Sequence, residues 1–356
     1  MRPDLAGSEG YIRNTWYVAG LSEDFGRDLT PVIMLEDEIV IYRDTQGKPA
    51  ALEDACPHRK LPLSRGTIEG DYVVCGYHGL TFDCSGECVI APTQLDNPPR
   101  RAAVRSYPAI DRWGFLWVWM GDASLAADTP IIDIPNFDNS DWGKTPRGGM
   151  AMDCHYLYIV DNLLDPSHVA WVHLTSFAGA GTDNRPLEIE ELDDGVIVGR
   201  WIADEVPPPY YQDMLPFGPK VDRKQHYECR LPSTAINMSV YTPTGEGGAD
   251  KPLSQNAFIN ISYNFITPVD ACTTKYFWFQ HRNMHSNDDA LSERMFEGAK
   301  MAFQEDKDVL EFVQKGMAKR KGGYLNLGLD AGAVRFRNRV AKAITAESAT
   351  KQLGDA

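Results

Sequence analysis

Two short clusters of cysteine and histidine limit what this chain can be more than any other feature of its sequence. Cys56 is followed by His58 after one intervening residue, and Cys75 by His78 after two. Thiolates and imidazoles are ligands for transition metals, and four of them in two neighbouring segments predict one centre held between two loops. The glycine and proline residues around them favour tight loops.

The spacing of these four residues favours an iron–sulfur cluster over zinc. In a [2Fe–2S] cluster of the Rieske type, two cysteines bind one iron and two histidines bind the other. Structural zinc sites also use cysteine and histidine, but usually as two pairs of like residues. Here each pair mixes the two residue types. A zinc-stabilised binding protein is the alternative, and it would be colourless where a Rieske protein is red-brown.

The overall composition is that of a folded, acidic protein. Of the 356 residues 43% are hydrophobic, which is enough for a core in each of two domains, and the formal net charge is −15. That charge argues against nucleic-acid binding, which needs a basic surface. No apolar run is long enough to cross a bilayer, and residues 1–17 do not have the composition of a secretory signal. We therefore expect a cytoplasmic protein with no membrane partner.

Hydrophobic patterning divides the chain into two domains. Residues 1–120 predict a small all-β domain, and residues 121–145, rich in Asp, Ala and Pro, predict a connection. Residues 146–356 predict an α+β domain with a long antiparallel sheet and helices. We expect a hairpin turn at 44–48, strands at Leu187–Asp204, Gln225–Leu231, Ala235–Tyr241, Asn256–Ile266 and Thr273–Arg282, and helices at Tyr156–His173, Asp288–Gly316 and Ala331–Ala346.

A second metal-binding pattern lies in the expected helix Tyr156–His173. It contains Asp165, His168 and His173 in the order D-x-x-H-x-x-x-x-H. Histidines five apart diverge on a regular α-helix, but a break at Pro166 lets both face one metal. Two histidines and one carboxylate form the facial site of non-haem Fe(II) oxygenases, with positions left open for O₂ and substrate. Two ordinary core histidines are the alternative.

Together the two patterns resemble the Rieske non-haem iron oxygenases over nearly the whole chain. Residues 162–173 match the family's catalytic motif, N-x-x-D-x-x-H-x-x-x-x-H. The resemblance implies a Rieske [2Fe–2S] cluster, a mononuclear Fe(II) and a catalytic domain of helix-grip-like α+β fold. The family's cluster motif is matched by Cys56, His58, Cys75 and His78, with Gly79 and Leu80 after them.

The resemblance also implies the remaining residues of the iron site. The third ligand comes from the long late helix, where Asp306 matches the family's position and Glu305 and Asp308 compete with it. Asn162 and Asp165 are the catalytic residues that the motif implies.

The same resemblance implies an assembly. Asp165 is expected to bridge His78 of one subunit and His168 of the next in a ring-shaped homotrimer. The chain has no nicotinamide or flavin fingerprint, so electrons are expected from a separate NAD(P)H-dependent reductase or a ferredoxin.

Within the family, the chain is most similar to the O-demethylating branch that acts on vanillate and dicamba. Segments 14–19, 55–60 and 160–165 carry this likeness. It implies O₂-dependent O-demethylation of a methoxylated aromatic acid to a phenol and formaldehyde. Asn237 matches a polar substrate contact of the branch, and Asn264 stands where relatives often have histidine. Each is equally well explained as a satisfied strand residue.

Other readings stay open. Tyr210, Tyr211 and Phe217 lie in a proline-rich loop that is either a cover for an aromatic ring or a packed surface loop. N-demethylation and hydroxylation of a ring or side chain are alternative reactions. A Rieske electron carrier is the alternative from another class, but a carrier has only the first domain and lacks the 165–173 pattern.

Overall fold

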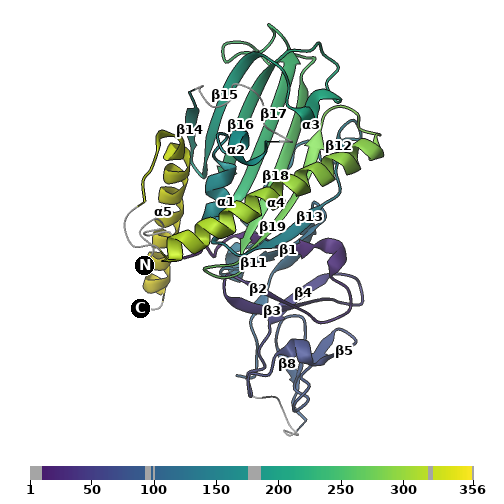
Figure 1. The fold of residues 1–356 in the computed structure, drawn as a ribbon. Helices are drawn as coiled ribbons and strands as arrows, with labels where there is room; N and C mark the ends of the chain where they lie inside the picture. The colour runs from purple at the N-terminus through teal and green to yellow at the C-terminus, as the bar shows by residue number, and fades with distance from the viewer. Residues whose placement is uncertain (1–9, 93–97, 99–100, 175–185, 320–323, 355–356) are drawn as a thin grey trace. The chain divides into compact units, whose positions relative to one another are not determined.

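The computed structural model describes residues 10–92, 98, 101–174, 186–319 and 324–354. Contacts divide the chain into two units. One comprises residues 13–134 and 267–270, and the other comprises the described residues of 1–12, 135–266 and 271–356. Figure 1 gives the labels of their elements. No helix in these ranges is both long and apolar enough to cross a membrane.

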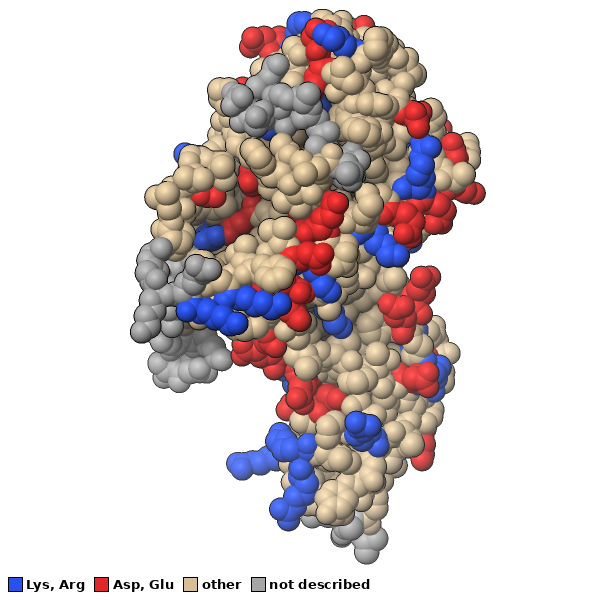
Figure 2. Space-filling model, in the orientation of Figure 1, with Lys and Arg blue, Asp and Glu red and all other residues tan. Residues whose placement is uncertain are grey.

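The surface is mixed in charge. On the face drawn in Figure 2, basic side chains of the described residues lie in separate small groups with acidic ones between them. No continuous basic surface appears on that face. With a net charge of −15, this distribution does not suit a phosphate backbone.

The first unit is all-β, as the sequence predicts. It has three antiparallel sheets with the strand orders β1-β11-β10, β2-β3-β4-β9 and β5-β6-β7-β8. Every residue of β11 is buried, in keeping with its run of aromatic and β-branched residues. The elements are β1 (Trp16–Leu21), η2 (Ser22–Asp24), β2 (Thr30–Met34), β3 (Asp37–Arg43), β4 (Pro49–Glu53), η3 (Leu63–Arg65), β5 (Thr67–Glu69), β6 (Tyr72–Val74), β7 (Thr81–Phe82), β8 (Cys88–Ile90), β9 (Ser106–Tyr107), β10 (Ala109–Arg112), β11 (Phe115–Trp119) and η4 (Ala123–Leu125).

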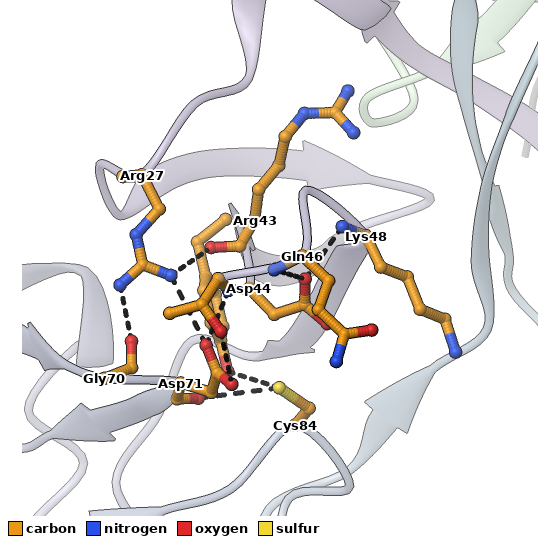
Figure 3. Close-up of polar contacts among 10 residues, drawn as sticks. Arg27, Arg43, Asp44, Gln46, Lys48, Gly70, Asp71 and Cys84 are labelled. Atoms are coloured by element: carbon orange, nitrogen blue, oxygen red, sulfur yellow. Dashed lines mark hydrogen bonds and ion pairs between the residues drawn. The ribbon is translucent and has the colours of Figure 1, made fainter.

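The predicted turn at 44–48 joins β3 to β4 and also holds the small β5–β8 sheet (Figure 3). Asp44 Oδ1 accepts hydrogen bonds from two backbone N–H groups of the turn, at 2.8 and 2.9 Å. Asp71, between β5 and β6, accepts from the N–H of Thr45 at 2.6 Å and from its hydroxyl at 3.0 Å. These bonds, with the charge of Arg27, keep the pKa of Asp71 below its ordinary value. The small β5–β8 sheet is thereby tied to the hairpin.

The second unit is α+β, again as predicted. Its antiparallel sheet has the order β12-β19-β18-β17-β16-β15-β14, and β13 also pairs with β19. The long helix α4 lies across one face of this sheet (Figure 1). The elements are β12 (Gly143–Lys144), β13 (Gly148–Met152), α1 (Tyr156–Leu163), α2 (Val169–Val172), β14 (Glu188–Leu192), β15 (Gly195–Glu205), α3 (Pro209–Gln212), β16 (Val221–Arg230), β17 (Thr234–Pro243), β18 (Phe258–Pro268), β19 (Thr274–Arg282), α4 (Asp289–Lys319), η5 (Gly328–Asp330) and α5 (Ala331–Gly354).

Two expected elements are each divided in the structure. The strand expected at Leu187–Asp204 is a hairpin of β14 and β15, because the sequence Asp193-Asp194-Gly195 supplies a turn. The helix expected at Tyr156–His173 ends at Leu163 and resumes as α2. Pro166 lies in the gap, where a continuous helix would lose a hydrogen bond and clash with the preceding turn.

Aromatic side chains pack α4 against the sheet. The ring of Phe303 meets Trp278 and Tyr276 of β19 edge-on, with centroids 5.1 and 5.0 Å apart. Each such pair contributes about 0.5–1.5 kcal/mol beyond its buried area. Arg337 of α5 donates to Asp161 of α1, with Nε 2.9 Å from Oδ1, and so fixes a further helix over the same core. The buried positions of α4 recur every three or four residues and include Leu291, Met295, Ala299, Ala302, Asp306 and Leu310.

We expect Gly66→Ala to destabilise the small β5–β8 sheet. A Cβ at Gly66 would lie 2.1 Å from the carbonyl oxygen of Val74, so the backbone of β6 must shift. Overpacking of this kind costs about 1–3 kcal/mol. The midpoint of thermal unfolding should fall, whereas Gly26→Ala, which meets nothing within 4 Å, should leave it unchanged. Equal midpoints for both variants would contradict this account.

Candidate metal centres and active-site cavity

The two cysteine–histidine segments form loops of the same design. The N–H of Cys56 donates to the carbonyl of Leu61 at 2.9 Å, and the N–H of Cys75 donates to the carbonyl of Leu80 at 2.8 Å. In each loop the bond spans five residues from the cysteine. The two loops are therefore closed by the same backbone hydrogen bond, although their cysteine–histidine spacings differ.

A tight turn closes each loop at the fourth residue after the cysteine. The N–H of Lys60 donates to Cys56 at 2.8 Å, and that of Gly79 donates to Cys75 at 3.1 Å. Both turn residues have positive φ, +59° at Lys60 and +71° at Gly79. Glycine adopts this conformation freely, but lysine is strained in it.

The four side chains converge in a way that fits a Rieske cluster. Cys56 and Cys75 are buried, and burial raises the pKa of the Cys56 thiol, so a metal is needed to hold it as a thiolate. His58 and His78 lie nearer the surface with their Nδ1 atoms 3.1 Å apart. Two ring nitrogens that face each other this closely suit one shared metal ion. The two thiols serve the second metal of the pair.

The break between α1 and α2 brings the second pair of histidines together. His168 lies just before α2 and His173 just after it. Their ring centroids are 5.2 Å apart, and both Nε2 atoms point to the same carboxylate. A regular helix would have turned these side chains apart, so the break at Pro166 is what creates the pair.

That carboxylate belongs to Asp306 on α4. Its Oδ1 lies 3.6 Å from Nε2 of His168 and 3.3 Å from Nε2 of His173. One ligand atom from each of the three residues lies within 4.8 Å of the other two. The side-chain amide of Asn162 donates to the same Oδ1 at 3.1 Å. Asp306 is only 4% exposed, so the structure places the favoured sequence candidate, rather than its neighbours, among the ligand atoms.

The competing acids take other positions. Glu305 lies behind the site, where its Oε2 is 2.8 Å from Nδ1 of His173 and so fixes the ring with Nε2 toward the metal. Burial lowers the pKa of His173, but Asp306 and Glu305 outweigh it and leave the pKa raised. Burial leaves the pKa of His168 below its ordinary value. Asp308 is exposed and accepts a hydrogen bond from Gln304.

Asp165 is held locally in this single chain. Its Oδ1 accepts from the N–H of Ser167 at 2.7 Å. The Nδ1 of His168 contacts the backbone carbonyl of Asp165, not the carboxylate. One carboxylate oxygen of Asp165 therefore takes no part in these two contacts, and the carboxylate lies near enough to the imidazole of His168 to raise its pKa against the larger effect of burial.

A cavity opens beside the three ligands. Its volume is about 90 Å³, and it is partly open to solvent. Asn237 lines it and donates to the carbonyl of Leu163 at 3.1 Å, while its Oδ1 has no partner among the described residues. The wall also contains Val169, Phe303, Ala302 and Ala299 from the helices and Ser239, Asn260, Ser262 and Gln280 from the sheet.

Asn264 lines the same cavity but is already fully bonded. Its amide nitrogen donates to the carbonyls of Ala235 and Ser262, at 3.2 and 3.0 Å. Its Oδ1 accepts from the hydroxyls of Ser262 and Tyr276, at 3.1 and 2.8 Å. These contacts favour the structural reading of Asn264 over a substrate contact.

The proline-rich loop forms the short helix α3 and contributes one ring to the site. Tyr211 lines the cavity, and its hydroxyl accepts from the amide of Asn260 at 3.1 Å. Tyr210 donates instead to Gln280 at 2.8 Å, and Phe217 packs in a neighbouring cluster.

Among the wall residues that sequence reasoning missed, Arg223 is the charged one. It lines the cavity and is 2% exposed. Its burial could have been predicted from the sequence. Alternation along β16 puts Arg223 on the same face as Val221 and Cys229, which are both fully buried.

Comparisons with known proteins agree with this geometry. A family model described as the vanillate O-demethylase oxygenase C-terminal domain matches residues 152–346, and one described as the Rieske [2Fe–2S] domain matches residues 15–108. The iron–sulfur subunit of the toluene-4-sulfonate monooxygenase system of Comamonas testosteroni is 36% identical over 313 residues, which cover 86% of this chain and 88% of that protein.

Further relatives cover almost the full length. The vanillate O-demethylase oxygenase subunit of a Pseudomonas species is 34% identical over 326 residues, covering 90% of this chain and 98% of that protein. The crystal structure of dicamba monooxygenase bound to 3,6-dichlorosalicylic acid superposes with a TM-score of 0.87 at 28% identity, covering 96% of this chain and 99% of that one.

The chain therefore belongs to the Rieske non-haem iron oxygenases, as a terminal oxygenase component. Its C-terminal domain is of the vanillate O-demethylase type, which places it in the branch of O-demethylases and N-dealkylases. Its cofactors are a Rieske [2Fe–2S] cluster and a mononuclear non-haem iron.

We expect Glu305→Gln to weaken iron binding while leaving the cluster intact. The variant removes the carboxylate that orients His173, and losing such a partner typically costs roughly 10- to 100-fold in metal affinity. Iron affinity measured by competition with a chelator should show this loss, with an unchanged visible spectrum of the cluster. Asp308→Asn makes the same charge change on the same helix and is the control. Equal affinity in the two variants would contradict the role of Glu305.

Proposed function

We propose that this oxygenase O-demethylates a methoxylated aromatic acid. The observation that carries the proposal is a cavity with an iron site of two histidines and one aspartate at one end and polar strand residues along its wall. Relatives named as O-demethylase components support the reaction. When bound, the iron supplies the activation of O₂, and the cluster supplies electrons one at a time.

The reaction balances with one O₂, two electrons and two protons. One oxygen atom enters a C–H bond of the methoxy group and the other leaves as water. The resulting hemiacetal breaks its bond between the methyl carbon and the phenolic oxygen, giving formaldehyde and a phenol. The protein's own residues hold the ring: Phe303 and Val169 give apolar contact, and Asn237 offers an unpartnered carbonyl oxygen to a hydroxyl group.

Electrons are supplied by a separate NAD(P)H-dependent reductase or a ferredoxin. Arg59 and Lys60 are exposed next to the cluster ligand His58. Cations at this position suit an acidic partner and would speed its association.

We expect formaldehyde from the purified protein during a single turnover. The iron-loaded chain, reduced chemically without air, is given aromatic acids with and without methoxy groups, and O₂ is then admitted. Formaldehyde matched by a phenol from one methoxylated acid supports the proposal. Oxidised product without formaldehyde would replace it with ring or side-chain hydroxylation. Formaldehyde from an N-methyl compound alone would replace it with N-demethylation.

We further propose that the enzyme works as a ring-shaped homotrimer, in which Asp165 bridges His168 and His78 of the partner subunit. His78 lies at the surface of its loop, and one oxygen of the Asp165 carboxylate is outside the local turn. Trp171 and Leu174, which lie next to the iron-site histidines in sequence, are 74% and 68% exposed, so a partner subunit could cover them. In this assembly the carboxylate accepts a hydrogen bond from each imidazole and fixes both tautomers.

Asp165→Asn should leave both metal centres filled and nearly abolish product formation. The amide keeps the shape of the side chain but cannot accept from two imidazoles equally. Iron and sulfide analysis reports the metal content, and product per O₂ consumed reports the coupling. Full activity of Asp165→Asn would contradict the proposed bridge. Mixed trimers of Cys56→Ser and His168→Ala chains should regain activity, and no rescue would count against transfer between subunits.

A further inference from the structure

Arg223 places a guanidinium in the wall of the active-site cavity, 5.7 Å from the centre of the Tyr241 ring and with two of its N–H-bearing nitrogens unbonded among the described residues. The side chain lines the cavity and is 2% exposed. Its Nε and Nη1 have no hydrogen-bond partner among the residues that the structure describes. Buried N–H groups of a charged side chain are normally all bonded, because leaving one unmade costs free energy. Two such groups on a side chain that lines a ligand cavity point to an anion as the missing partner.

The surrounding charges do not satisfy this guanidinium. Burial lowers the pKa of Arg223, but the phenol groups of Tyr241 and Tyr227 and the carboxylate of Glu205 outweigh it and leave the pKa raised, so the side chain stays charged. Glu205 acts on Arg200 as well. The pKa of Arg200 is lowered, by burial first and also by the charge of Arg223. One buried carboxylate is thus shared between two buried guanidinium groups, and an added anion would relieve the imbalance.

Arg223 lies far along the sheet from the iron ligands. Asn237, bonded to the end of α1, pairs with Tyr227 on β16, and Arg223 is four residues further along that strand. Four strand residues span about 14 Å at about 3.4 Å each. A group held by Arg223 is therefore separated from the iron site by enough space for an aromatic ring.

The wall near Arg223 offers further polar groups. Ser239 and Asn260 are paired neighbours on β17 and β18, and both line the cavity. Asn260 donates to Tyr211 at 3.1 Å, while its Oδ1 has no partner among the described residues. A hydroxyl and an amide beside a guanidinium suit the several oxygens of a carboxylate or sulfonate, since the amide can present its N–H₂ by rotation.

We propose that Arg223 anchors the anionic group of the substrate, an aromatic carboxylate or sulfonate whose charged group and oxidised carbon lie on opposite sides of the ring. The inference rests on the proposed function for the location of the oxidised carbon. The forked donors of arginine match two oxygens of such an anion at once. Arg223 therefore selects charged aromatic substrates over neutral ones of the same shape.

Binding without turnover tests the proposal. The iron-loaded full-length protein, kept without O₂, is titrated calorimetrically with 4-methoxybenzoate, 4-methoxybenzenesulfonate and the neutral 4-methoxybenzamide. The wild-type protein should bind one or both anions more tightly than the amide. Arg223→Gln should weaken the preferred anion roughly 10- to 100-fold, as the loss of charged hydrogen bonds predicts, and leave the amide unchanged. Arg223→Lys keeps the charge but not the forked donors, so its affinity for the anion should lie between those of the wild type and Arg223→Gln.

A matched control separates this effect from general loss of charge. Lys224→Gln removes a positive charge one residue away, on the opposite face of β16, and should bind the anions like the wild type. Anion affinity that is equal in Arg223→Gln, Arg223→Lys and the wild type, with unchanged thermal unfolding, overturns the proposal. So does a wild-type preference for the amide. A preference between the two anions identifies which acid the site takes.

The outcomes also separate this inference from the proposed reaction. Anion binding that depends on Arg223, without formaldehyde from any methoxylated acid, would keep the anchor and reject O-demethylation. Formaldehyde from a methoxylated acid at equal efficiency in Arg223→Gln and the wild type would keep the reaction and reject the anchor.

Discussion

The catalytic unit depends on one buried carboxylate, that of Asp306. It occupies a position in the buried stripe of α4 where the neighbouring positions are alanine and leucine. A lone carboxylate there would be costly, since burial removes its hydration. His168, His173 and Asn162 converge on a single oxygen of it. The carboxylate therefore joins α4 to the segment between α1 and α2, and the same contacts that make its burial tolerable define the iron site.

Patterns local in sequence could be predicted, and pairings across the fold could not. The cysteine–histidine pairs and the 165–173 motif are short-range signals, and so are the all-β and α+β character of the two parts. Asp306 could be predicted as the third ligand only through family resemblance, because nothing near it in the sequence indicates which of the three acids faces the histidines. The role of Glu305 depends on its meeting His173, which is 132 residues away. The division of the 187–204 segment was visible in its Asp-Asp-Gly turn but was outweighed by the surrounding strand-forming residues.

The two metal centres are built by different physical means. In the first unit the backbone positions the ligands, because two loops with the same hydrogen bonds present them from tight turns. In the second, side-chain packing does it, because α4 is pressed onto β19 by aromatic rings and carries Asp306 with it. A strained Lys60 is compatible with the first design, since the loop is fixed at both ends by the bonds of Cys56.

The bonding of Asn264 has a consequence for how this enzyme can diversify. Its amide group joins three neighbouring strands through four hydrogen bonds, so exchange of this residue disturbs the scaffold before it alters selectivity. Asn237 and Arg223, on the adjacent strands, reach the same cavity with atoms that the fold does not use. Substitution is therefore restricted where β18 forms the wall of the site, whereas the part formed by β17 and β16 can change its chemistry at smaller structural cost, and new substrate ranges should arise there.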